Sequence, residues 1–477
     1  MRRILLNWKV HLFALIFVII AEAIHSIPVN LPFTILGARI TFFIFPMLIA
    51  MTLGIIAYLV KLLDKQTVSA ATPFIGIATM WLIAVLAIGI GPRLSDMREA
   101  GWAFVLQEFG NLGMALLAVP VAVFIFSMGR QAIGASFSKS REPSIAIISN
   151  MYGLNSPEGQ GVMGAYIVGT VLGTLFCGIL ASIVIATGIF DPIALAMGAG
   201  SGSASMMIAF LAPMEFVYPD RWEELQAVAS MSNLITAATG IYFSMFITIP
   251  VCKWMYKVFD GEGRYMRKLE RKAAKTGKPV EMPEEMPEEI PEEMPEEMPE
   301  VVEAAPEEKV AAPMPSLKEV WIERAEVLVF SGVFAIIGNF IFTTRNPNPN
   351  VVTVMPHQSA YALLVMAIPV VLGCLLYDFF TRKTKINLPA IIYISLLGII
   401  LGIPGMPLAV PFATAARSFG LLPLATPILA YAGISLGKDL KAFKESGVGI
   451  IVVTLLAFTG TYLGSAIIAH VYLVLAR

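Results

Sequence analysis

The stretch "AMGAGSGSASMMIAF", residues 196–210, separates two long apolar segments and is almost entirely glycine, alanine and serine up to residue 205. Glycine costs about 1 kcal/mol per helix position relative to alanine, so Gly198, Gly200 and Gly202 disfavour an uninterrupted helix. Irregular backbone persists at membrane depth only where protein groups or a water-filled cavity satisfy its hydrogen bonds. We therefore expect this small-residue tract to be a broken or re-entrant element that lines a binding site.

The rest of the chain has the composition of a multispanning membrane protein. Of its 477 residues, 57% are hydrophobic and only 14% are charged. A transmembrane helix needs about 20 apolar residues. Eleven windows meet this requirement: Trp8–Ile24, Ile40–Leu63, Ala70–Ile90, Trp102–Met128, Val162–Ile189, Ala227–Lys257, Val320–Phe342, Ser359–Phe380, Leu388–Ile403, Pro411–Leu436 and Val448–Leu475. The sequence thus predicts an all-α polytopic membrane protein with about 11 transmembrane helices plus the broken tract.

The lysines and arginines orient these helices. Arg2, Arg3 and Lys9 place the N-terminus in the cytoplasm, and we interpret the first window as an uncleaved helix although its AEA tripeptide could also end a signal peptide. The cation-rich segment 253–272 then lies in the cytoplasm, and the acidic loop 214–226 lies outside, only if the tract returns to the side it entered. We expect a multi-pass protein of the cytoplasmic membrane of a prokaryote.

The chain divides into three parts. Residues 1–259 form an N-terminal membrane half and residues 318–477 a C-terminal membrane half. Between them, residues 260–317 contain five "MPEE"-like tetrads. A proline at every fourth position excludes a stable helix and the glutamates exclude a core, so this segment is expected to be a disordered cytoplasmic linker.

The two halves resemble each other. The sequence "LGIIAY" (53–58) recurs as "LGCLLY" (372–377), and "FGNLGMALLAVPVAVFIFSMGR" (109–130) recurs as "FGLLPLATPILAYAGISLGK" (419–438). Internal repeats with paired interrupted helices are typical of secondary transporters, which bind substrate between the halves. The copies are parallel if the small-residue tract re-enters, and inverted if it crosses the membrane.

Polar residues in apolar windows indicate where ions and substrates bind, because they are costly in a membrane. Glu108 and Asn111 share a helix face at positions i and i+3, and Gly110 loosens the helix between them. The Glu108 carboxylate could hold a cation beside freed backbone carbonyls, or exchange a proton. The alternative is that Glu108 lies at the outer interface and is hydrated.

A later helix carries a continuous stripe of small polar residues at steps of three and four. These are Ser230, Asn233, Thr236, Gly240 and Ser244. Such a stripe is typical of a close helix contact, but Asn233 is bulkier and more costly to leave unpaired. We therefore expect Asn233 and Thr236 to join the coupling-ion site, with Na⁺ held by Glu108, Asn111 and Asn233 if the ion is a metal; we expect no other cofactor.

Arg417 lies inside an apolar window of the second half, where the repeat predicts an interruption near Gly420. A guanidinium suits a carboxylate, which indicates an anionic substrate; the alternative is that Arg417 reaches the outer surface. The expected substrate site combines residues of both halves: Gly198, Gly200, Ser201, Gly202, Ser203, Ser205, Thr414, Arg417 and Ser418.

The order "LLAVPVAVF", "VLGTLFCG", "GAGSGSASMM", an acidic loop and "VASMSNLITAATGIYFSMFITIP" resembles the core of the LrgB family, which includes the plastid glycolate–glycerate transporter. It is more loosely similar to the lysine exporter and 2-keto-3-deoxygluconate permease families of the cation:proton antiporter and anion transporter superfamily. The resemblance implies an elevator-type carrier with scaffold and core domains, and a homodimer. The histidine usual in the LrgB tract is absent, since Gly202 or Ser203 stands there. The whole chain most resembles an uncharacterised prokaryotic family of transporter-like membrane proteins, a domain of unknown function.

These observations predict a secondary active transporter of a small organic anion, coupled to Na⁺ or H⁺, and not an enzyme. Its partners are the lipid bilayer and the substrate, with no nucleic acid. A holin-like or regulatory membrane protein is the main alternative. An intramembrane protease with Ser201 as nucleophile and His470 as base is a weaker one, because a lone serine and a lone histidine recur by chance in apolar chains.

Overall fold

The structure is a computed structural model that describes residues 2–35, 38–94, 101–137, 141–153, 155–276, 316–346, 352–383, 388–438, 443–444 and 446–476. The described residues are mostly helical, as expected. The exception is an antiparallel hairpin of β1 (Ile27–Ile35) and β2 (Ala38–Ile44), in which Ile27 pairs with Ile44. The hairpin corrects the expected span Ile40–Leu63, because residues 40–44 belong to strand β2. A shorter helix begins only at Pro46, and proline is well suited to the first turn of a helix.

Helices in the N-terminal half vary in length, and several are interrupted. Their bounds are α1 (Arg2–Ile24), α2 (Pro46–Leu59), α3 (Lys65–Ala70), α4 (Thr72–Ile90), α6 (Gly101–Leu106), α7 (Leu112–Pro120), α8 (Gln131–Ser136), α9 (Arg141–Tyr152), α10 (Pro157–Val168), α11 (Thr174–Ala186), α12 (Pro192–Gly200), α13 (Ala204–Val217), α14 (Trp222–Phe243), α15 (Ile249–Val258) and α16 (Gly261–Thr276). A 3₁₀ segment, η2 (Gln107–Asn111), separates α6 from α7.

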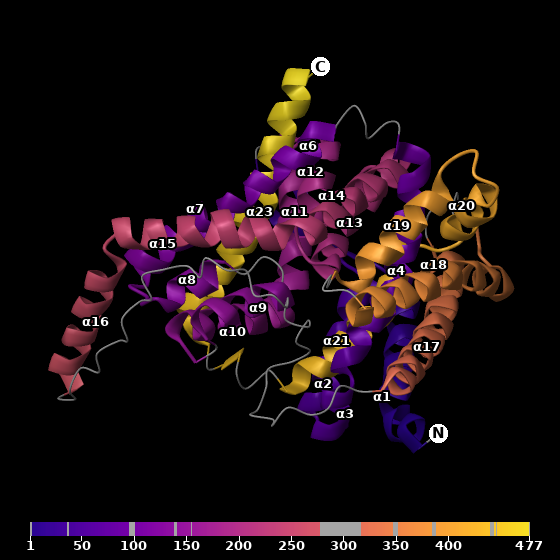
Figure 1. Cartoon of the computed structure of the whole chain (residues 1–477), viewed down its shortest axis with the longest axis horizontal. Helices are drawn as coiled ribbons and strands as arrows, with labels where there is room; N and C mark the ends of the chain where they lie inside the picture. Colours follow the sequence, from indigo (N-terminus) through magenta and orange to yellow (C-terminus); the bar gives the residue numbers. More distant parts are fainter. Residues whose placement is uncertain are drawn as a thin grey trace.

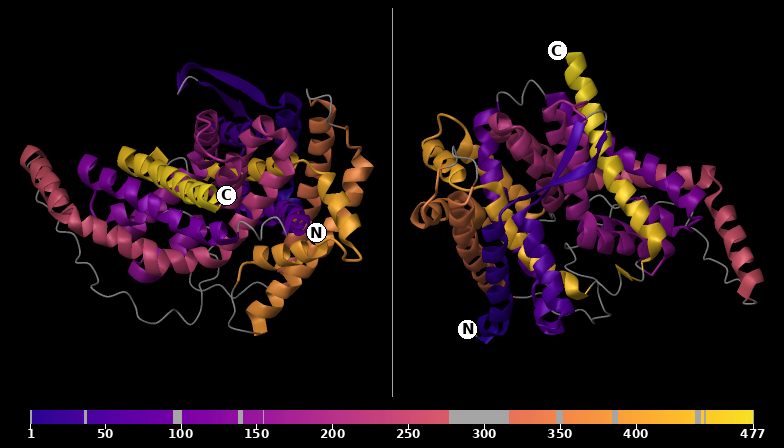
Figure 2. Two further views of the ribbon diagram at one scale, coloured as in Figure 1. Left: turned by 90° about the horizontal axis from the view of Figure 1, so that it is seen from above. Right: turned by 180° about the vertical axis from the view of Figure 1, so that it is seen from behind.

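Helices in the C-terminal half are fewer and longer. Their bounds are α17 (Leu317–Thr344), α18 (Pro356–Lys383), α19 (Ala390–Gly402), α20 (Ala409–Arg417), α21 (Leu421–Ser435) and α23 (Gly447–Ala476). Figure 1 places α7, α8, α10, α15 and α16 toward one end of the long axis, and α1, α17, α18 and α20 toward the other. The hairpin β1–β2 runs along the outside of the helical body, on the face seen from behind in Figure 2, where β2 packs on α11.

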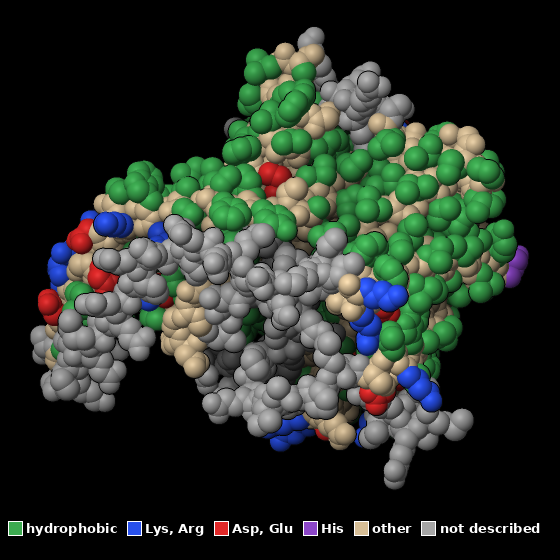
Figure 3. All heavy atoms as spheres, viewed as in Figure 1, with side chains coloured by type: hydrophobic (Ala, Val, Ile, Leu, Met, Phe, Trp, Pro, Cys, Tyr) green, Lys and Arg blue, Asp and Glu red, His purple; other side chains and the backbone are tan. Residues whose placement is uncertain are grey.

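The described helices include seven that are long and apolar enough to cross a membrane. Two bent pairs qualify as broken spans, one that joins α14 to α15 with a bend of 64° and one that joins α20 to α21 with a bend of 66°. Shorter apolar helices are α2, α13 and α19. In the view of Figure 3, hydrophobic side chains cover most of the described upper surface, while lysines and arginines gather along its lower and left margins. The chain is a multi-pass membrane protein.

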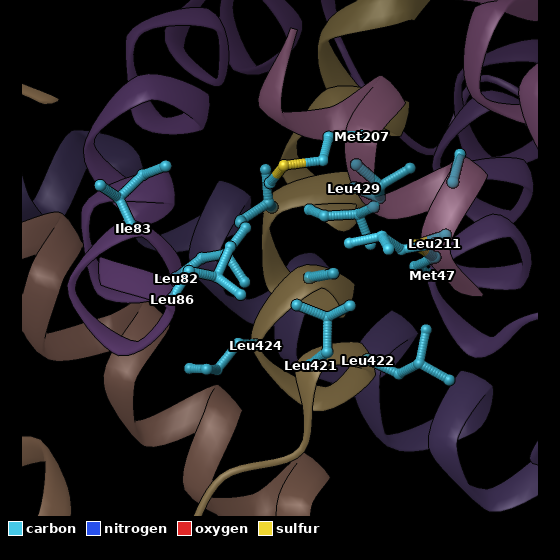
Figure 4. Close-up of a cluster of buried hydrophobic side chains, with 14 of the residues drawn as sticks. Met47, Leu82, Ile83, Leu86, Met207, Leu211, Leu421, Leu422, Leu424 and Leu429 are labelled. Carbon is cyan, nitrogen blue, oxygen red and sulfur yellow. The ribbon is translucent and has the colours of Figure 1, made fainter. Parts of the chain in front are cut away.

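Helices of the two halves interpack through the core. Figure 4 shows Met47 of α2, Leu82 and Leu86 of α4, and Met207 and Leu211 of α13 around the leucines of α21. Two contacts are so close that glycine is required. A Cβ on Gly433 of α21 would overlap Met51 of α2, and one on Gly113 of α7 would overlap the Gly460 carbonyl of α23. Each half thus contributes a helix to the packing of the other.

The first part of the expected disordered linker 260–317 is helical. Residues Gly261–Thr276 form α16, an amphipathic helix whose charged side chains include Arg264, Arg267 and Lys268. Lys268 Nζ donates to the Phe126 carbonyl at 2.7 Å, which ties α16 to the loop after α7. The MPEE tetrads lie outside the described residues.

Candidate functional site

The small-residue tract is broken where the sequence predicts it. Helix α12 ends at Gly200 and α13 begins at Ala204, so Ser201, Gly202 and Ser203 leave the regular helix. Ser201 Oγ donates back to the Gly198 carbonyl at 2.6 Å, which closes the end of α12. The prediction of an interrupted helix is confirmed.

The two ends of the tract lie close together. Asp191, which caps the start of α12, interacts electrostatically with Tyr218 and Arg221, which follow the end of α13. A tract that crossed the whole bundle would separate these residues by its full length. Helices α12 and α13 therefore fold back on each other as a helical hairpin.

Side chains of α14 satisfy the backbone that the break exposes. Asn233 Nδ2 donates to the Gly200 carbonyl at 3.0 Å and to the Gly202 carbonyl at 2.8 Å. Ser232 Oγ donates to the Met197 carbonyl at 2.7 Å. A Cβ on Gly200 would overlap the Ala229 carbonyl and the Ser232 side chain, so glycine here permits the approach of α14. Asn233 thus caps the break with its amide hydrogens, and its role at the coupling-ion site stays a prediction.

A buried carboxylate lies one turn farther along α14. Thr236 Oγ1 makes a short hydrogen bond to Glu108 Oε1, and Glu108 is only 5% exposed. Gln107 Nε2 donates to Glu108 Oε1 at 3.1 Å, and Asn111 Nδ2 donates to Oε2 at 3.0 Å. Amide hydrogens only donate, so this arrangement suits the ionised carboxylate. The alternative of a hydrated Glu108 at the interface does not hold in this structure.

Two amide oxygens of this cluster have no hydrogen-bond partner in the described part of the chain. They are Gln107 Oε1 and Asn111 Oδ1, and both residues are at most 1% exposed. Unpartnered buried acceptors are rare and need an explanation. Both amides turn their N–H groups toward the carboxylate, and rotation of either amide would bring its oxygen there instead. A carboxylate with amide oxygens is the ligand type that a hard cation prefers. Gln107 is absent from the sequence-based candidates, although its position in the polar run "QEFGN" is a signal for it.

Segment η2 positions these side chains. It winds as a 3₁₀ helix, in which residues i and i+3 share a side, so Glu108 and Asn111 project together. Gln107 reaches the Glu108 carboxylate from the neighbouring position. Ser465 Oγ of α23 donates to the Gln107 carbonyl at 2.9 Å. Gly110 has a packing role, because a Cβ there would overlap the Ser465 backbone.

A small cavity lies beside Asn233. Its lining residues are Ile83, Leu86, Ala87, Ile90, Met207, Ser230, Asn233, Leu234, Ile391 and Ser395. The volume open to the centre of a water molecule is about 10 Å³, which is room for about one water. The cavity lies between α4 and α19 on one side and α13 and α14 on the other. In this conformation it is too small for an organic anion.

The second half has its own break, between α20 and α21. Asn339 of α17 caps it: Nδ2 donates to the Ser418 carbonyl at 2.8 Å, and Oδ1 accepts from Gly420 N at 3.1 Å. Asn339 is fully buried. The predicted interruption near Gly420 is thus present, and its cap is an asparagine, as at the first break.

The structure does not bring Arg417 into the cluster around Glu108. Its side chain is 68% exposed, and its Nη2 lies 3.3 Å from Glu223 Oε2 at the start of α14. Glu223 precedes Asn233 by ten residues, about 15 Å along the helix. Thr414 is exposed as well, and the Ser418 hydroxyl donates to its carbonyl at 3.0 Å. This separation corrects the expectation that residues of both halves meet in one substrate site.

The other serines of the tract and His470 each have a hydrogen-bond partner. Ser203 Oγ and Ser205 Oγ lie 3.3 Å apart at the start of α13. His470 Nδ1 accepts from the Asp191 backbone N–H at 3.0 Å, at the entrance of the hairpin, whereas Ser201 bonds at its tip. The two residues of the expected protease pair therefore have different partners.

A family model described as a protein of unknown function (DUF3100) matches residues 14–258, slightly more than half of the chain. The chain belongs to this family. The DUF3100 match ends with α15 and includes Glu108, the tract and Asn233. No curated protein and no solved structure matches the chain, so its likeness to the LrgB, lysine exporter and permease families stays a prediction.

Proposed function

We propose that this protein is a secondary active transporter that couples a small organic anion to a cation gradient. The observation that carries the proposal is the placement of the buried Glu108 carboxylate one turn of α14 away from a capped break in a helical hairpin. Interrupted helices beside intramembrane ionisable groups are how carriers bind substrate and coupling ion together.

The cation site of this proposal consists of Glu108, Gln107 and Asn111. The carboxylate supplies the charge, and the two amide oxygens without partners supply further ligands. We assign Na⁺ to this site, with H⁺ as the alternative coupling ion. Asn233 and Thr236 then have supporting roles, because the first holds the break and the second donates to the carboxylate.

The anion site of this proposal lies at the start of α13. Its N-cap Ser203 makes no side-chain capping bond, so the first backbone N–H groups of a 14-residue helix are directed at the break. A helix N-terminus favours a carboxylate. The hydroxyls of Ser203 and Ser205 and the cavity beside Asn233 complete the site, which widens when α12–α14 move relative to α4 and α19. Arg417 is outside it.

The architecture of the proposal extends the sequence-based topology. The seven long helices, the two bent pairs and the shorter α2 and α19 supply eleven crossings, and α12–α13 is re-entrant. The N-terminus and residues 260–317 are cytoplasmic, and α4 with α19 belongs to the scaffold of an elevator-type homodimer. The repeated segments 109–130 and 419–438 contain α7 and α21, which pack in like manner on α23 and α2 through close glycine contacts.

The test is uptake by proteoliposomes. Full-length protein is reconstituted, and ¹⁴C-labelled acetate, glycolate, pyruvate and succinate are supplied with an inward Na⁺ gradient or with choline. We expect saturable, Na⁺-dependent accumulation of one or more of these acids. Asn111→Ala, which keeps the carboxylate, should reduce it at least tenfold, since a ligand is lost. Glu223→Gln, a change at an exposed carboxylate, is the matched control and should transport normally.

Two results would contradict the proposal. Unsaturable leakage that ignores the Na⁺ gradient would favour the holin-like alternative. Full Na⁺ dependence in Asn111→Ala and in Glu108→Gln, with both variants folded by gel filtration, would remove the cation from this cluster.

A further inference from the structure

A second buried carboxyl group lies outside the cluster described above. Glu22, in the last turn of α1, is completely buried. Thr426 Oγ1 of α21 lies 2.6 Å from Glu22 Oε1, and Glu22 Oε2 has no hydrogen-bond partner among the described residues. Glu108 has three donors, two of them amides, whereas Glu22 has a single hydroxyl. The two carboxyl groups thus have different hydrogen-bond requirements.

The hydroxyl of Thr426 has two acceptors within reach but only one hydrogen. Its Oγ1 lies 2.6 Å from Glu22 Oε1 and 2.9 Å from the Leu422 carbonyl. Two full hydrogen bonds form at once if Glu22 is protonated, because its O–H then donates to Thr426 while Thr426 donates to Leu422; otherwise the two acceptors share one hydrogen. An ionised Glu22 would compete for the hydrogen of Thr426 and weaken the bond to the Leu422 carbonyl.

A second carboxyl group disfavours charge on Glu22. Glu215, near the end of α13, interacts electrostatically with Glu22, and its Oε2 is also buried without a partner. Neighbouring carboxylates in an apolar surrounding repel each other, so the pair retains a proton or a cation. The rings of Phe43 and Phe45 pack on Phe216, the residue after Glu215, with centroids 4.6 and 6.0 Å away.

Other titratable groups near α1 are accounted for. His25 follows Glu22 by three residues, is 9% exposed and has no partner for either ring nitrogen in the described structure. Nη1 of Arg345, the residue after α17, donates to the Ala23 carbonyl at 2.7 Å. Helix α17 faces Glu22 itself with Gly338. Farther along α1, His11 contacts Tyr431 of α21 and Glu326 of α17, eleven residues or about 16 Å from Glu22.

We propose that Glu22, Thr426 and Glu215 form a proton-binding site in which Glu22 carries the proton. Loading forms one O–H bond on a carboxylate oxygen of Glu22, and release returns the proton to water. A proton needs one oxygen, whereas a hard metal ion needs a shell of several. The Thr426 hydroxyl, which lies between Glu22 and the Leu422 carbonyl, also suits a protonated carboxyl group as its neighbour. A metal ion would instead bind to the lone pairs of the Thr426 oxygen.

The site connects the two interrupted elements of the molecule. Glu215 belongs to the second arm of the helical hairpin, and Thr426 belongs to the helix after the α20–α21 break. Protonation of Glu22 would therefore favour the present packing of α21 on α1 and of α13 on α21. A role of this proton in coupling rests on the proposed transport function, but its binding does not.

The experiment is the pH dependence of thermal unfolding. Purified full-length protein in detergent, in Na⁺-free choline buffer, is heated at pH values from 5 to 9. We expect the wild-type midpoint to fall by several degrees as pH rises, because a proton held only by the folded state stabilises less as protons become scarce. Glu22→Gln imitates the protonated carboxyl group, and its midpoint should change less over this range. Thr426→Val should shift the fall to lower pH, and Glu223→Gln should follow the wild type.

Each other outcome is informative. A Glu22→Gln curve parallel to that of the wild type, with Thr426→Val also parallel, would overturn the proposal. If NaCl raises the thermal unfolding midpoint at pH 9 back to its low-pH value in the wild type, but not in Glu22→Gln, the site binds a metal ion instead of a proton. Failure of every labelled acid in the uptake assay, with the Glu22-dependent pH effect intact, would contradict the carrier function and leave the proton site standing.

Discussion

Glu108 and Glu22 are both buried carboxyl groups that bond to a threonine of another helix, yet their surroundings favour opposite charge states. Glu108 is surrounded by donors, two amides and a hydroxyl. Glu22 has one hydroxyl that needs its own hydrogen for a backbone carbonyl, and a second carboxyl group nearby. The difference teaches that burial alone does not define an intramembrane carboxyl group, since two buried groups differ in the hydrogen-bond donors that surround them.

The largest expected effect comes from the same substitution at the two sites. Glu108→Gln places an amide among donors, so at least one buried hydrogen loses its acceptor, and unfolding free energy should fall by roughly 2–3 kcal/mol. Glu22→Gln should cost less than about 1 kcal/mol, because an amide can donate to Thr426 as a protonated carboxyl group does. Denaturant or thermal unfolding in detergent at pH 7 measures both. Equal losses would mean that the two sites do not differ.

The capped breaks provide the next comparison. Asn233→Leu removes the donor to two carbonyls of the first break, and Asn339→Leu removes the contacts of the second. Each should lower the unfolding free energy by about 1–3 kcal/mol, since buried carbonyls are left unsatisfied. Asn233→Leu should in addition reduce uptake, because the tract belongs to the proposed anion site. Wild-type uptake and stability in Asn233→Leu would show that the break needs no cap.

Substitution of the two threonines, Thr236 beside Glu108 and Thr426 beside Glu22, gives a finer comparison of the two sites. Thr236→Val removes a donor to a charged group and should cost about 1.5–3 kcal/mol, whereas Thr426→Val interrupts a neutral relay and should cost about 1 kcal/mol. Valine has nearly the same shape as threonine, so packing is preserved. Unfolding midpoints at pH 6, where Glu22 is expected to be protonated, measure the difference, and the reverse order would exchange the two charge assignments.

The smallest effect is expected at Arg417. Its ion pair with Glu223 is exposed, and such pairs contribute about 0–1 kcal/mol. Arg417→Ala should therefore keep its stability and, because Arg417 lies outside the proposed site, most of its uptake. Loss of saturable uptake in folded protein would restore the sequence-based hypothesis that this guanidinium receives the substrate.

Part of the candidate site could be predicted from single residues. Polar groups are costly in a membrane, so Glu108, Asn111, Asn233 and Thr236 stand out in apolar windows. Glu22 lies in such a window too, but in the sequence it is the centre of an AEA tripeptide that resembles a cleavage site. Its significance comes from Glu215 and Thr426, which are distant in sequence and meet it only in the folded chain.

By itself, the amino-acid sequence determined the membrane class and the position of the break near Gly200, because apolar length and glycine content act locally on the backbone. Only the tertiary structure decided which polar groups share a site. It brought Asn233 to the break as a cap, left Arg417 at the surface and joined Glu22 to Thr426. The physical reason is that hydrogen bonding and ion pairing act over a few ångströms in space, whereas the partners lie tens to hundreds of residues apart along the chain.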